Sequence, residues 1–253
     1  MKIDLDQRRD LGELISLTFQ LFGRHLAVFL SLTLLIVAPV QLVVDGVWGR
    51  YLADGGDAEP STAAATTSML LGVLVIPPLV TALQVVAVQA IARGEEPTVG
   101  GALRTAAPRL VPAVFAVILY SAAVAAGLIA LVVPGIWLAV RWYFCAQAVV
   151  IDRLAPVEAL RRSAQVVETR WWRTFGVLVA FGLVVALLAA VGLGIARQIE
   201  NGPLFTTASI VVQTVTLSLT AIFGTLLFFD SRARTALPWE GTPPIDPVAP
   251  ERP

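Results

Sequence analysis

The sequence predicts an all-α integral membrane protein: a helical bundle with six transmembrane helices and amphipathic helices at the cytoplasmic interface. Three observations support this fold class. Of 253 residues, 57% are hydrophobic and only 14% are charged, whereas soluble domains are about a quarter charged. Apolar runs long enough to cross a bilayer recur along the chain. The basic residues gather on one side of these runs, as they do in membrane proteins.

Five apolar runs stand out, and the third is too long for one crossing. It extends over residues 110–151, whereas about 20 helical residues cross the apolar core of a bilayer. Pro134 and Gly135 interrupt it, because proline removes a backbone donor and glycine frees the backbone. We therefore expect a turn at these two residues, which divides the run. The six predicted spans, within one membrane domain over 1–234, are 26–44, 67–92, 110–133, 136–151, 172–196 and 207–229.

Both ends of the chain are expected in the cytoplasm. Asp4, Asp6 and Asp10 stand where a cleavable signal peptide has basic residues, so the first span should remain in the mature protein. Residues 235–253 are rich in proline, which predicts a short disordered cytoplasmic tail. The alternative for this tail is a ligand for a proline-binding domain.

The orientation follows from the arginines. Fifteen of the 18 basic residues fall on the side of the N-terminus, and only Arg50 and Arg197 fall on the opposite side. The positive-inside rule then places both termini inside. Aromatic residues favour the same arrangement, with Trp137 at the outer interface and Trp171 at the inner one. Lys2 is the only lysine, a bias typical of GC-rich bacterial genomes, so we expect a bacterial plasma membrane.

An amphipathic stretch precedes each outward-going span, at 10–24, 99–110 and 157–171. A helix with a narrow apolar face and charged flanks lies in the interface plane. The first and third stretches also align without a gap, so that Arg24 matches Arg170. We expect three parallel units, each an interfacial helix followed by a transmembrane hairpin. The alternative is that inner loops between two spans are amphipathic for general reasons.

Arg141 lies inside the fourth predicted span. An arginine in the middle of a span costs about 3 kcal/mol or more, so it should face protein or water. Asp45, at the outer end of the first span, is a candidate partner. The alternatives are that Arg141 extends to the outer surface or binds a substrate, and we favour the ion pair or the extension over substrate binding.

Uncharged polar residues recur within the spans. One face of the last span carries a stripe with steps of four, three and four residues. These residues either line a hydrophilic cavity or bond between helices, at about 0.6 kcal/mol each, and we favour the second interpretation. The stripe is Ser209, Gln213, Thr216 and Thr220, and the intramembrane glutamines elsewhere are Gln41, Gln84, Gln89 and Gln147. The fifth span carries a small-residue face that predicts close helix packing, formed by Gly182, Ala186, Ala190 and Gly194.

The sequence argues against catalysis and against nucleic-acid binding. The net charge is zero, which provides no basic field for nucleic acid. His25 is the only histidine and Cys145 the only cysteine, which nearly excludes a histidine-based metal site or triad. We expect no cofactor, metal or catalytic residue. The carboxylates between the spans, Asp152 and Glu168 among them, are interpreted as ordinary surface charges.

An ordered series of short motifs resembles the bacterial family named for the membrane domain of glycerophosphoryl diester phosphodiesterases. The series comprises Pro134-Gly135-Ile136, Arg141, 149–152, 158–163, 171–176 and 230–234. The resemblance covers nearly the whole chain and implies a six-span membrane architecture. In that family, phosphodiester hydrolysis belongs to a separate soluble barrel. This chain looks like the membrane part alone, so the resemblance carries over no catalytic residue.

We therefore expect a non-enzymatic membrane module that anchors, assembles or regulates a partner in the plasma membrane. Its partners would be the lipid bilayer and another membrane or cytoplasmic protein, or an amphiphilic ligand. The alternative is a carrier or exporter of an amphiphilic or lipid-like small molecule, and a membrane-embedded enzyme ranks below both. The polar stripe of the last span separates the first two functions, because a cavity along it favours the carrier and tight packing favours the module.

Overall fold

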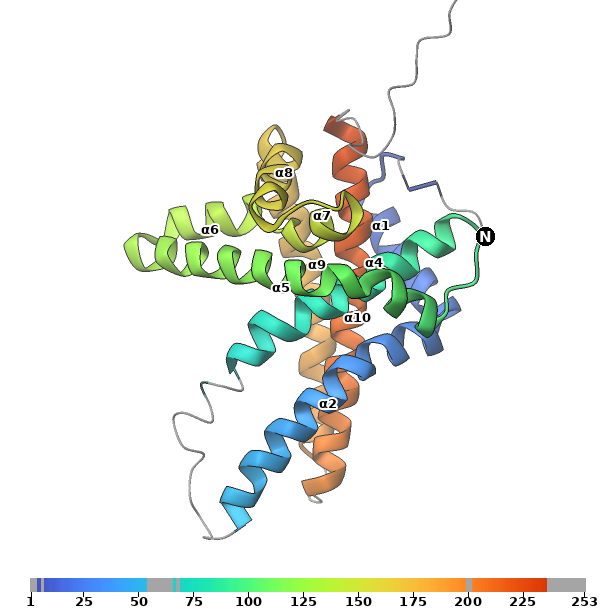
Figure 1. Ribbon diagram of the computed structural model, residues 1–253, viewed down its shortest axis with the longest axis vertical. Helices are drawn as coiled ribbons and strands as arrows, with labels where there is room; N and C mark the ends of the chain where they lie inside the picture. Colours follow the sequence, from blue (N-terminus) through green and yellow to red (C-terminus); the bar gives the residue numbers. More distant parts are fainter. Residues whose placement is uncertain (1–3, 6, 54–65, 67–68, 199–201, 236–253) are drawn as a thin grey trace, which may run out of the picture.

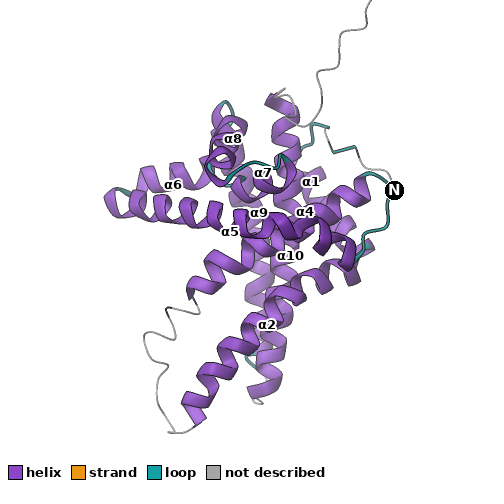
Figure 2. Cartoon of the chain, in the orientation of Figure 1, coloured by secondary structure: helices purple, strands orange, loops and turns teal. Residues whose placement is uncertain are grey.

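The computed structural model describes residues 4–5, 7–53, 66, 69–198 and 202–235, and its regular secondary structure over these residues is entirely helical (Figure 1, Figure 2). The elements are α1 (Leu11–Arg24), α2 (Leu26–Ala53), the π-helix η1 (Leu71–Val75), α4 (Ile76–Ala92), α5 (Val99–Ala130), α6 (Val132–Arg141), α7 (Cys145–Ile151), α8 (Pro156–Glu168), α9 (Trp171–Ala196) and α10 (Gly202–Thr235). Of the predicted tail at 235–253, Thr235 ends α10 and residues 236–253 lie outside the described residues.

Five helical segments of the described chain are long and apolar enough to cross a membrane, and the bent pair of α1 and α2 raises this number to six. The chain is therefore a multi-pass membrane protein in contact with the bilayer, and the predicted fold class is confirmed. The five segments are Leu71–Ala92, Val99–Ala130, Val132–Ile151, Trp171–Ala196 and Thr207–Thr235.

The long helix α10 forms the centre of the bundle, where it packs against α1, α2, α4 and α9 (Figure 1). Its second half is lined with wholly buried side chains, which include Phe223 and Phe228. Phe223 stacks on Phe181 of α9, with ring centroids 3.6 Å apart, and Phe228 meets Phe144 edge-on. Aromatic contacts of this kind fix the position of α9 and of the segment between α6 and α7 against α10.

The amphipathic helices α1 and α8 are separate from the spans that follow them. α1 meets α2 at an angle of 86°, with His25 between them. α8 ends at Glu168, and α9 begins at Trp171. Each helix begins with a carboxylate that accepts a backbone N–H three residues earlier, Glu13 from Asp10 and Glu158 from Ala155. The first and third predicted units therefore share one local design.

The second unit differs from the prediction. α5 runs without a break from Val99 to Ala130, so residues 99–110 are not a separate interfacial helix. Thr98 caps this helix by accepting from the backbone N–H of Gly101. Residues 104–110 supply neither a cap nor a glycine that would end the helix, and α5 continues through Pro108 and Pro112.

The turn of the hairpin between α5 and α6 lies at Leu131, three residues before the predicted turn. Leu131 has an extended backbone, and Pro134 stands in the first turn of α6, where a proline loses no hydrogen bond. Gly135 instead serves packing, because a Cβ atom there would lie 2.7 Å from the backbone nitrogen of Leu128. The division of the long apolar run was predicted correctly, but its position was wrong.

The α-helix of the fourth span is interrupted. α6 has only 10 residues, about 15 Å of helix, and residues 142–144 separate it from α7. The indole N–H of Trp171 donates to the carbonyl of Trp137 at 3.2 Å. Two bonded tryptophans cannot stand at opposite interfaces of an apolar core about 30 Å thick. The prediction that Trp137 and Trp171 lie at opposite interfaces is therefore wrong, and Figure 1 shows the α5–α6 hairpin extending sideways from α10.

The predicted small-residue face of α9 packs against no helix of the described chain. Gly182, Ala186, Ala190 and Gly194 are all exposed, and nothing lies within 4 Å of a Cβ atom built on Gly182 or Gly194. Close packing uses Gly192 instead, where a Cβ would lie 2.7 Å from Val212 of α10. Periodicity identified a small-residue face, but not the face that turns inward.

Candidate functional site

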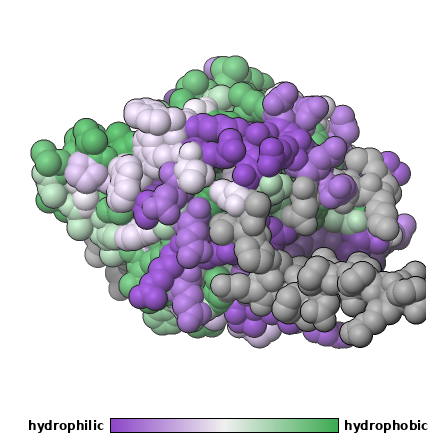
Figure 3. Space-filling model, turned by 90° about the horizontal axis from the view of Figure 1, so that it is seen from above, coloured by the Kyte–Doolittle hydropathy of each residue, from purple (hydrophilic) through white to green (hydrophobic). Residues whose placement is uncertain are grey.

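The face seen from above in Figure 3 carries hydrophilic residues across its centre and hydrophobic residues along its left and upper edges. α8, the end of α10 and the start of α9 meet at this end of the bundle (Figure 1). We call it the arginine-rich end.

Asp230 of α10 is the centre of one ionic cluster at this end, and its side chain is wholly buried. It accepts hydrogen bonds from the backbone N–H of Arg9 at 2.7 Å, from Arg173 of α9 at 2.8 Å and from Arg234 at 2.9 Å. The carbonyl of Arg9 in turn accepts from Arg173 at 3.0 Å and from Arg234 at 2.7 Å. This Asp230 cluster joins the N-terminal segment, α9 and α10.

Asp152 is the centre of a second buried cluster. It follows directly on α7, and its Oδ2 accepts from Nε of Arg162 of α8 at 2.9 Å. Nη1 of Arg232 lies 3.7 Å from its Oδ1, and the Arg232 guanidinium also stands over the ring of Phe229 at 4.7 Å. The side chains are nearly inaccessible, at 0% for Asp152 and 5% for Arg162. This Asp152 cluster joins α7, α8 and α10.

Both aspartates were missed by the sequence interpretation, which treated Asp152 as an ordinary surface charge; that interpretation is wrong. The available signal was their position. Asp152 directly follows Val149-Val150-Ile151, and Asp230 directly follows Leu226-Leu227-Phe228-Phe229. A carboxylate at the end of a buried apolar run requires a cation, because an unpaired charge in such a place is costly.

Ser163 of α8 holds the break between α6 and α7. Its hydroxyl accepts from the backbone N–H of Phe144 at 3.1 Å and donates to the carbonyl of Arg141 at 3.0 Å. Backbone groups freed by the helix break are thus satisfied by a neighbouring helix, as an intramembrane break requires.

A cavity of about 840 Å³ opens beside the Asp152 cluster, where α4, α5 and the segment after α7 meet. Its polar lining includes Arg93, Arg109, Arg153 and Asp152. Arg93 pairs with Glu95 at 3.0 Å, and this hydrogen bond holds the pKa of the Glu95 carboxyl below its usual range. The remaining lining is mostly apolar and consists of Val86, Gln89, Thr105, Pro108, Val150, Ile151 and Leu154.

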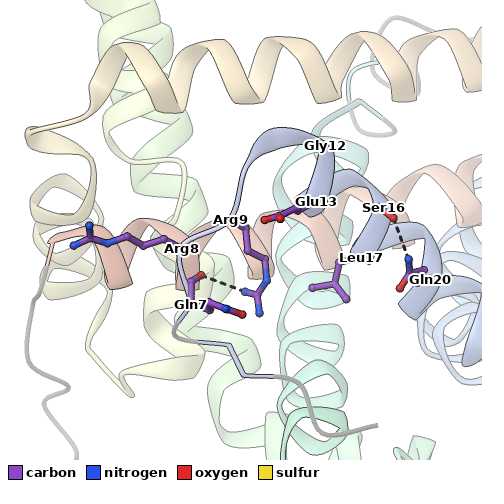
Figure 4. A pocket seen from close by; sticks show the side chains of 8 residues that line it. All are labelled: Gln7, Arg8, Arg9, Gly12, Glu13, Ser16, Leu17 and Gln20. Atoms are coloured by element: carbon purple, nitrogen blue, oxygen red, sulfur yellow. Dashed lines mark hydrogen bonds between the residues drawn. The ribbon is translucent and has the colours of Figure 1, made fainter.

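A second hollow, of about 570 Å³, follows the polar side of α1 and the segment before it (Figure 4). Gln20 donates to Ser16 at 3.0 Å along its floor, and Arg9 donates to the carbonyl of Gln7. Arg8 and Glu13 also line it, and both are exposed. We call this hollow the α1 groove.

Inside the bundle, Thr33 of α2 accepts a hydrogen bond from the amide nitrogen of Gln84 of α4 at 2.6 Å. Its hydroxyl also lies 2.7 Å from that of Ser218 of α10. All three side chains are wholly buried. This Thr33 cluster joins three helices and makes interhelical hydrogen bonds, as we expected of Gln84, while Thr33 and Ser218 were not singled out from the sequence.

The predicted stripe on the last span is half-buried and largely bonds to its own helix. Thr216 donates to the carbonyl of Val212, and Thr220 donates to that of Thr216. Ser209 and Gln213 are likewise half-buried. The wholly buried Ser218 belongs to another face of the same helix, so the stripe is not the polar face that joins α10 to α2 and α4.

The other predicted polar residues lie apart from the stripe. Gln147 of α7 is buried against α10, where its amide nitrogen would lie 2.8 Å from a Cβ atom on Gly224. Gln89 lines the cavity beside the Asp152 cluster. The side chains of Gln41 and Asp45 lie outside the described residues, although the backbone there belongs to α2.

Arg141 ends α6 and lies close to the arginine-rich end. Its guanidinium stands 4.8 Å from the ring of Trp137 and 3.8 Å from a carboxylate oxygen of Glu168. The side chains are 25% exposed for Arg141 and 63% for Glu168. The described contacts are therefore with α6 and α8, whereas the sequence suggested Asp45 in the first span.

The comparisons with known proteins identify a family but no activity. A family described as a domain of unknown function (DUF7847) matches residues 98–231, more than half of the chain. The chain belongs to this family. No curated protein and no solved structure matches it. The DUF7847 region contains both buried aspartates, while Arg9, Thr33 and Gln84 lie before it. Within the described part of the chain, His, Cys, Asp and Glu form no group of three or more that could hold a metal ion.

Proposed function

We propose that this chain is a non-enzymatic membrane module that holds a protein partner at the cytoplasmic face of a bacterial plasma membrane. The observation that carries the proposal is the use of its polar residues. Polar residues deep in the bundle, such as Thr33 and Ser218, make hydrogen bonds between helices. At the arginine-rich end, the two buried aspartates hold four arginines in place: Arg162, Arg173, Arg232 and Arg234.

The two aspartate clusters favour a preorganised platform. The Asp230 cluster fixes the N-terminal segment on α9 and α10, and the Asp152 cluster fixes α8 on the same end of α10. Charged hydrogen bonds in buried surroundings hold side chains in one arrangement. The α1 groove adds an exposed polar hollow at the edge of this platform, and partners bind rigid surfaces at a lower entropic cost.

The resemblance to the membrane domain of glycerophosphoryl diester phosphodiesterases supports the same division of labour. A membrane domain without its own catalytic groups would work beside a separate protein or domain. The predicted topology, with the arginine-rich end in the cytoplasm, belongs to this proposal and follows from the positive-inside rule.

A carrier of an amphiphilic molecule is the second candidate, and the cavity of about 840 Å³ favours it. The π-helix η1, directly before Pro77 and Pro78, also favours it, because such helices are frequent at functional sites. The packing of the Thr33 cluster weighs against a path through the centre of the bundle.

Site-specific photocrosslinking in native membranes tests the module. A photoreactive residue at Glu13 or Gln20 in the α1 groove should give a protein adduct of defined size. The same residue at Leu183 or Leu187, which are exposed on the apolar surface of α9, should give lipid adducts alone. Equal protein adducts from both sets, or none from the groove, would contradict a platform at this face.

Cysteine accessibility separates the module from the carrier. In a Cys145→Ser background, Thr216→Cys and Thr220→Cys should resist a hydrophilic thiol reagent applied to both sides of the membrane. Gln165→Cys, on the exposed side of α8, is the reactive control. Rapid labelling at 216 and 220 would favour an aqueous path and the carrier.

A further inference from the structure

The cavity among α4, α5 and the segment after α7 has an excess of positive charge. Three of its lining residues are arginines, and the only acidic one is Asp152. Asp152 is already neutralised by Arg162 and Arg232. Arg93 is neutralised by Glu95, which leaves Arg109 and Arg153 as the net charge of the cavity.

Arg109 and Arg153 form no ion pair with a carboxylate among the described residues. Arg109 uses Nη1 to donate to the carbonyl of Arg153 at 3.3 Å, and its remaining N–H groups have no partner in the described chain. Arg153 has φ of 56°, a left-handed conformation that is uncommon for a residue other than glycine and often marks a functional constraint. This backbone directs its carbonyl to Arg109 and brings two arginines to one rim.

Much of the remaining lining is apolar. Val86, Pro108, Val150 and Ile151 belong to helices of the candidate spans Leu71–Ala92, Val99–Ala130 and Val132–Ile151. The cavity therefore lies where the spans end and combines an apolar lining with two guanidinium groups that have no carboxylate partner in the described chain. An anion with an attached hydrocarbon part satisfies both, because arginine matches phosphate geometry and the apolar lining removes hydrocarbon from water.

We propose that this cavity binds the phosphodiester headgroup of an anionic phospholipid. Arg109 and Arg153 would hold the phosphate, in the way that basic pockets between transmembrane helices hold lipid headgroups. Asp152 itself stays with Arg162 and Arg232, because its side chain is wholly buried. The apolar lining favours a phosphate that carries acyl chains over a bare phosphate. This site is independent of the partner module proposed above.

Native mass spectrometry of the full chain, released from nanodiscs, tests the site. Phosphatidylglycerol should be retained as a one-to-one adduct more strongly than phosphatidylcholine of the same acyl chains. The double variant Arg109→Gln with Arg153→Asn should weaken phosphatidylglycerol binding on the order of tenfold or more, because two charged hydrogen bonds are lost. Glutamine keeps the helix propensity of α5, and asparagine tolerates the left-handed conformation at 153.

The matched control is Arg104→Gln, which removes an exposed arginine one turn earlier on α5, outside the cavity lining. It should leave phosphatidylglycerol binding unchanged. The thermal midpoint of each variant in phosphatidylcholine nanodiscs shows whether it folds. The single variant Arg153→Asn, at an exposed position, should also weaken phosphatidylglycerol binding. A similar loss of binding in Arg104→Gln, or none in the double variant, would overturn the site.

Inorganic phosphate and glycerol 3-phosphate distinguish a lipid from a soluble anion. Neither should raise the thermal midpoint at millimolar concentration, whereas phosphatidylglycerol should raise it in the wild type but not in the double variant. Stabilisation by glycerol 3-phosphate equal to that by the lipid would overturn the lipid assignment. The photocrosslinking at the α1 groove is unaffected by either outcome, so failure of one proposal is distinguishable from failure of the other.

Discussion

The Asp230 cluster and the Thr33 cluster both join helices that are distant in the sequence, but they do so with different chemistry. Asp230 is a buried charge that satisfies two arginines and a backbone N–H. Thr33 joins neutral groups of Gln84 and Ser218. Removing one member of a buried ionic set leaves an uncompensated charge, whereas a neutral intramembrane hydrogen bond contributes about 0.6 kcal/mol on average. The ionic end should therefore control folding, and the neutral cluster should only adjust packing.

The largest effect should come from Asp230→Asn. Arg173 and Arg234 then lose their counter-charge, and the expected loss is about 3 kcal/mol of unfolding free energy, toward the lower limit for buried pairs because Arg173 is partly exposed. Denaturant unfolding in a mild detergent, followed by tryptophan fluorescence, measures it. Glu96→Gln, an exposed acid in the α4–α5 connection, is the control. Equal losses for the two variants would remove the special role of Asp230.

The Asp152 cluster should show a somewhat smaller effect in Arg162→Ala. Asp152 keeps Arg232 at 3.7 Å after the substitution, so we expect a loss of about 2 kcal/mol. The neighbouring Arg161 is exposed, and Arg161→Ala should change the unfolding free energy by less than about 0.5 kcal/mol. The two variants remove the same side chain one residue apart on α8, so a difference between them isolates burial and pairing. Equal losses of unfolding free energy for Arg162→Ala and Arg161→Ala would contradict the structure.

The Thr33 cluster should respond weakly. Ser218→Ala removes the hydrogen bond with Thr33 and a longer one to the carbonyl of Phe29, and at about 0.6 kcal/mol each it should cost about 1 kcal/mol. Thr33→Val should cost about 1 kcal/mol, because the buried amide of Gln84 then loses its acceptor. The double variant should cost less than the two single costs added, since the groups share one network. Losses as large as that of Asp230→Asn would erase the contrast between the two clusters.

The sequence was sufficient for the fold class because the bilayer imposes long apolar helices and a basic side. It was also sufficient for α1, which begins with a carboxylate cap and has one apolar face. It could not reveal the pairing of Arg9 with Asp230, because 221 residues separate them and periodicity contains only local information. The four-residue steps on α9 failed for a related reason. A helix can carry small or polar residues on two faces, and only its neighbours decide which face is buried.

The break after α6 had no local signal either. Trp142, Tyr143 and Phe144 read as a continuation of the apolar run, yet the helix breaks there because Ser163 of α8 satisfies the freed backbone groups. The proline and glycine that suggested a turn lie inside the first turns of α6 instead. Turn residues thus marked the correct hairpin, while the position of the turn depended on the packing of Gly135 on Leu128.

A weak effect should also come from Arg141, the residue that the sequence made most prominent. Its contact with Glu168 is long and partly exposed, so Arg141→Ala should cost less than about 1 kcal/mol, including its interaction with the Trp137 ring. A double-mutant cycle identifies the partner. Arg141→Ala should couple weakly with Glu168→Gln and be additive with Asp45→Ala, because charges that do not interact contribute independently. Thermal unfolding at low and at high salt completes the test, since an exposed pair loses its coupling when salt screens it. Strong coupling to Asp45 that persists in salt would instead place Arg141 in a buried pair with the first span, and the assignment of Glu168 and Trp137 as its partners would be wrong.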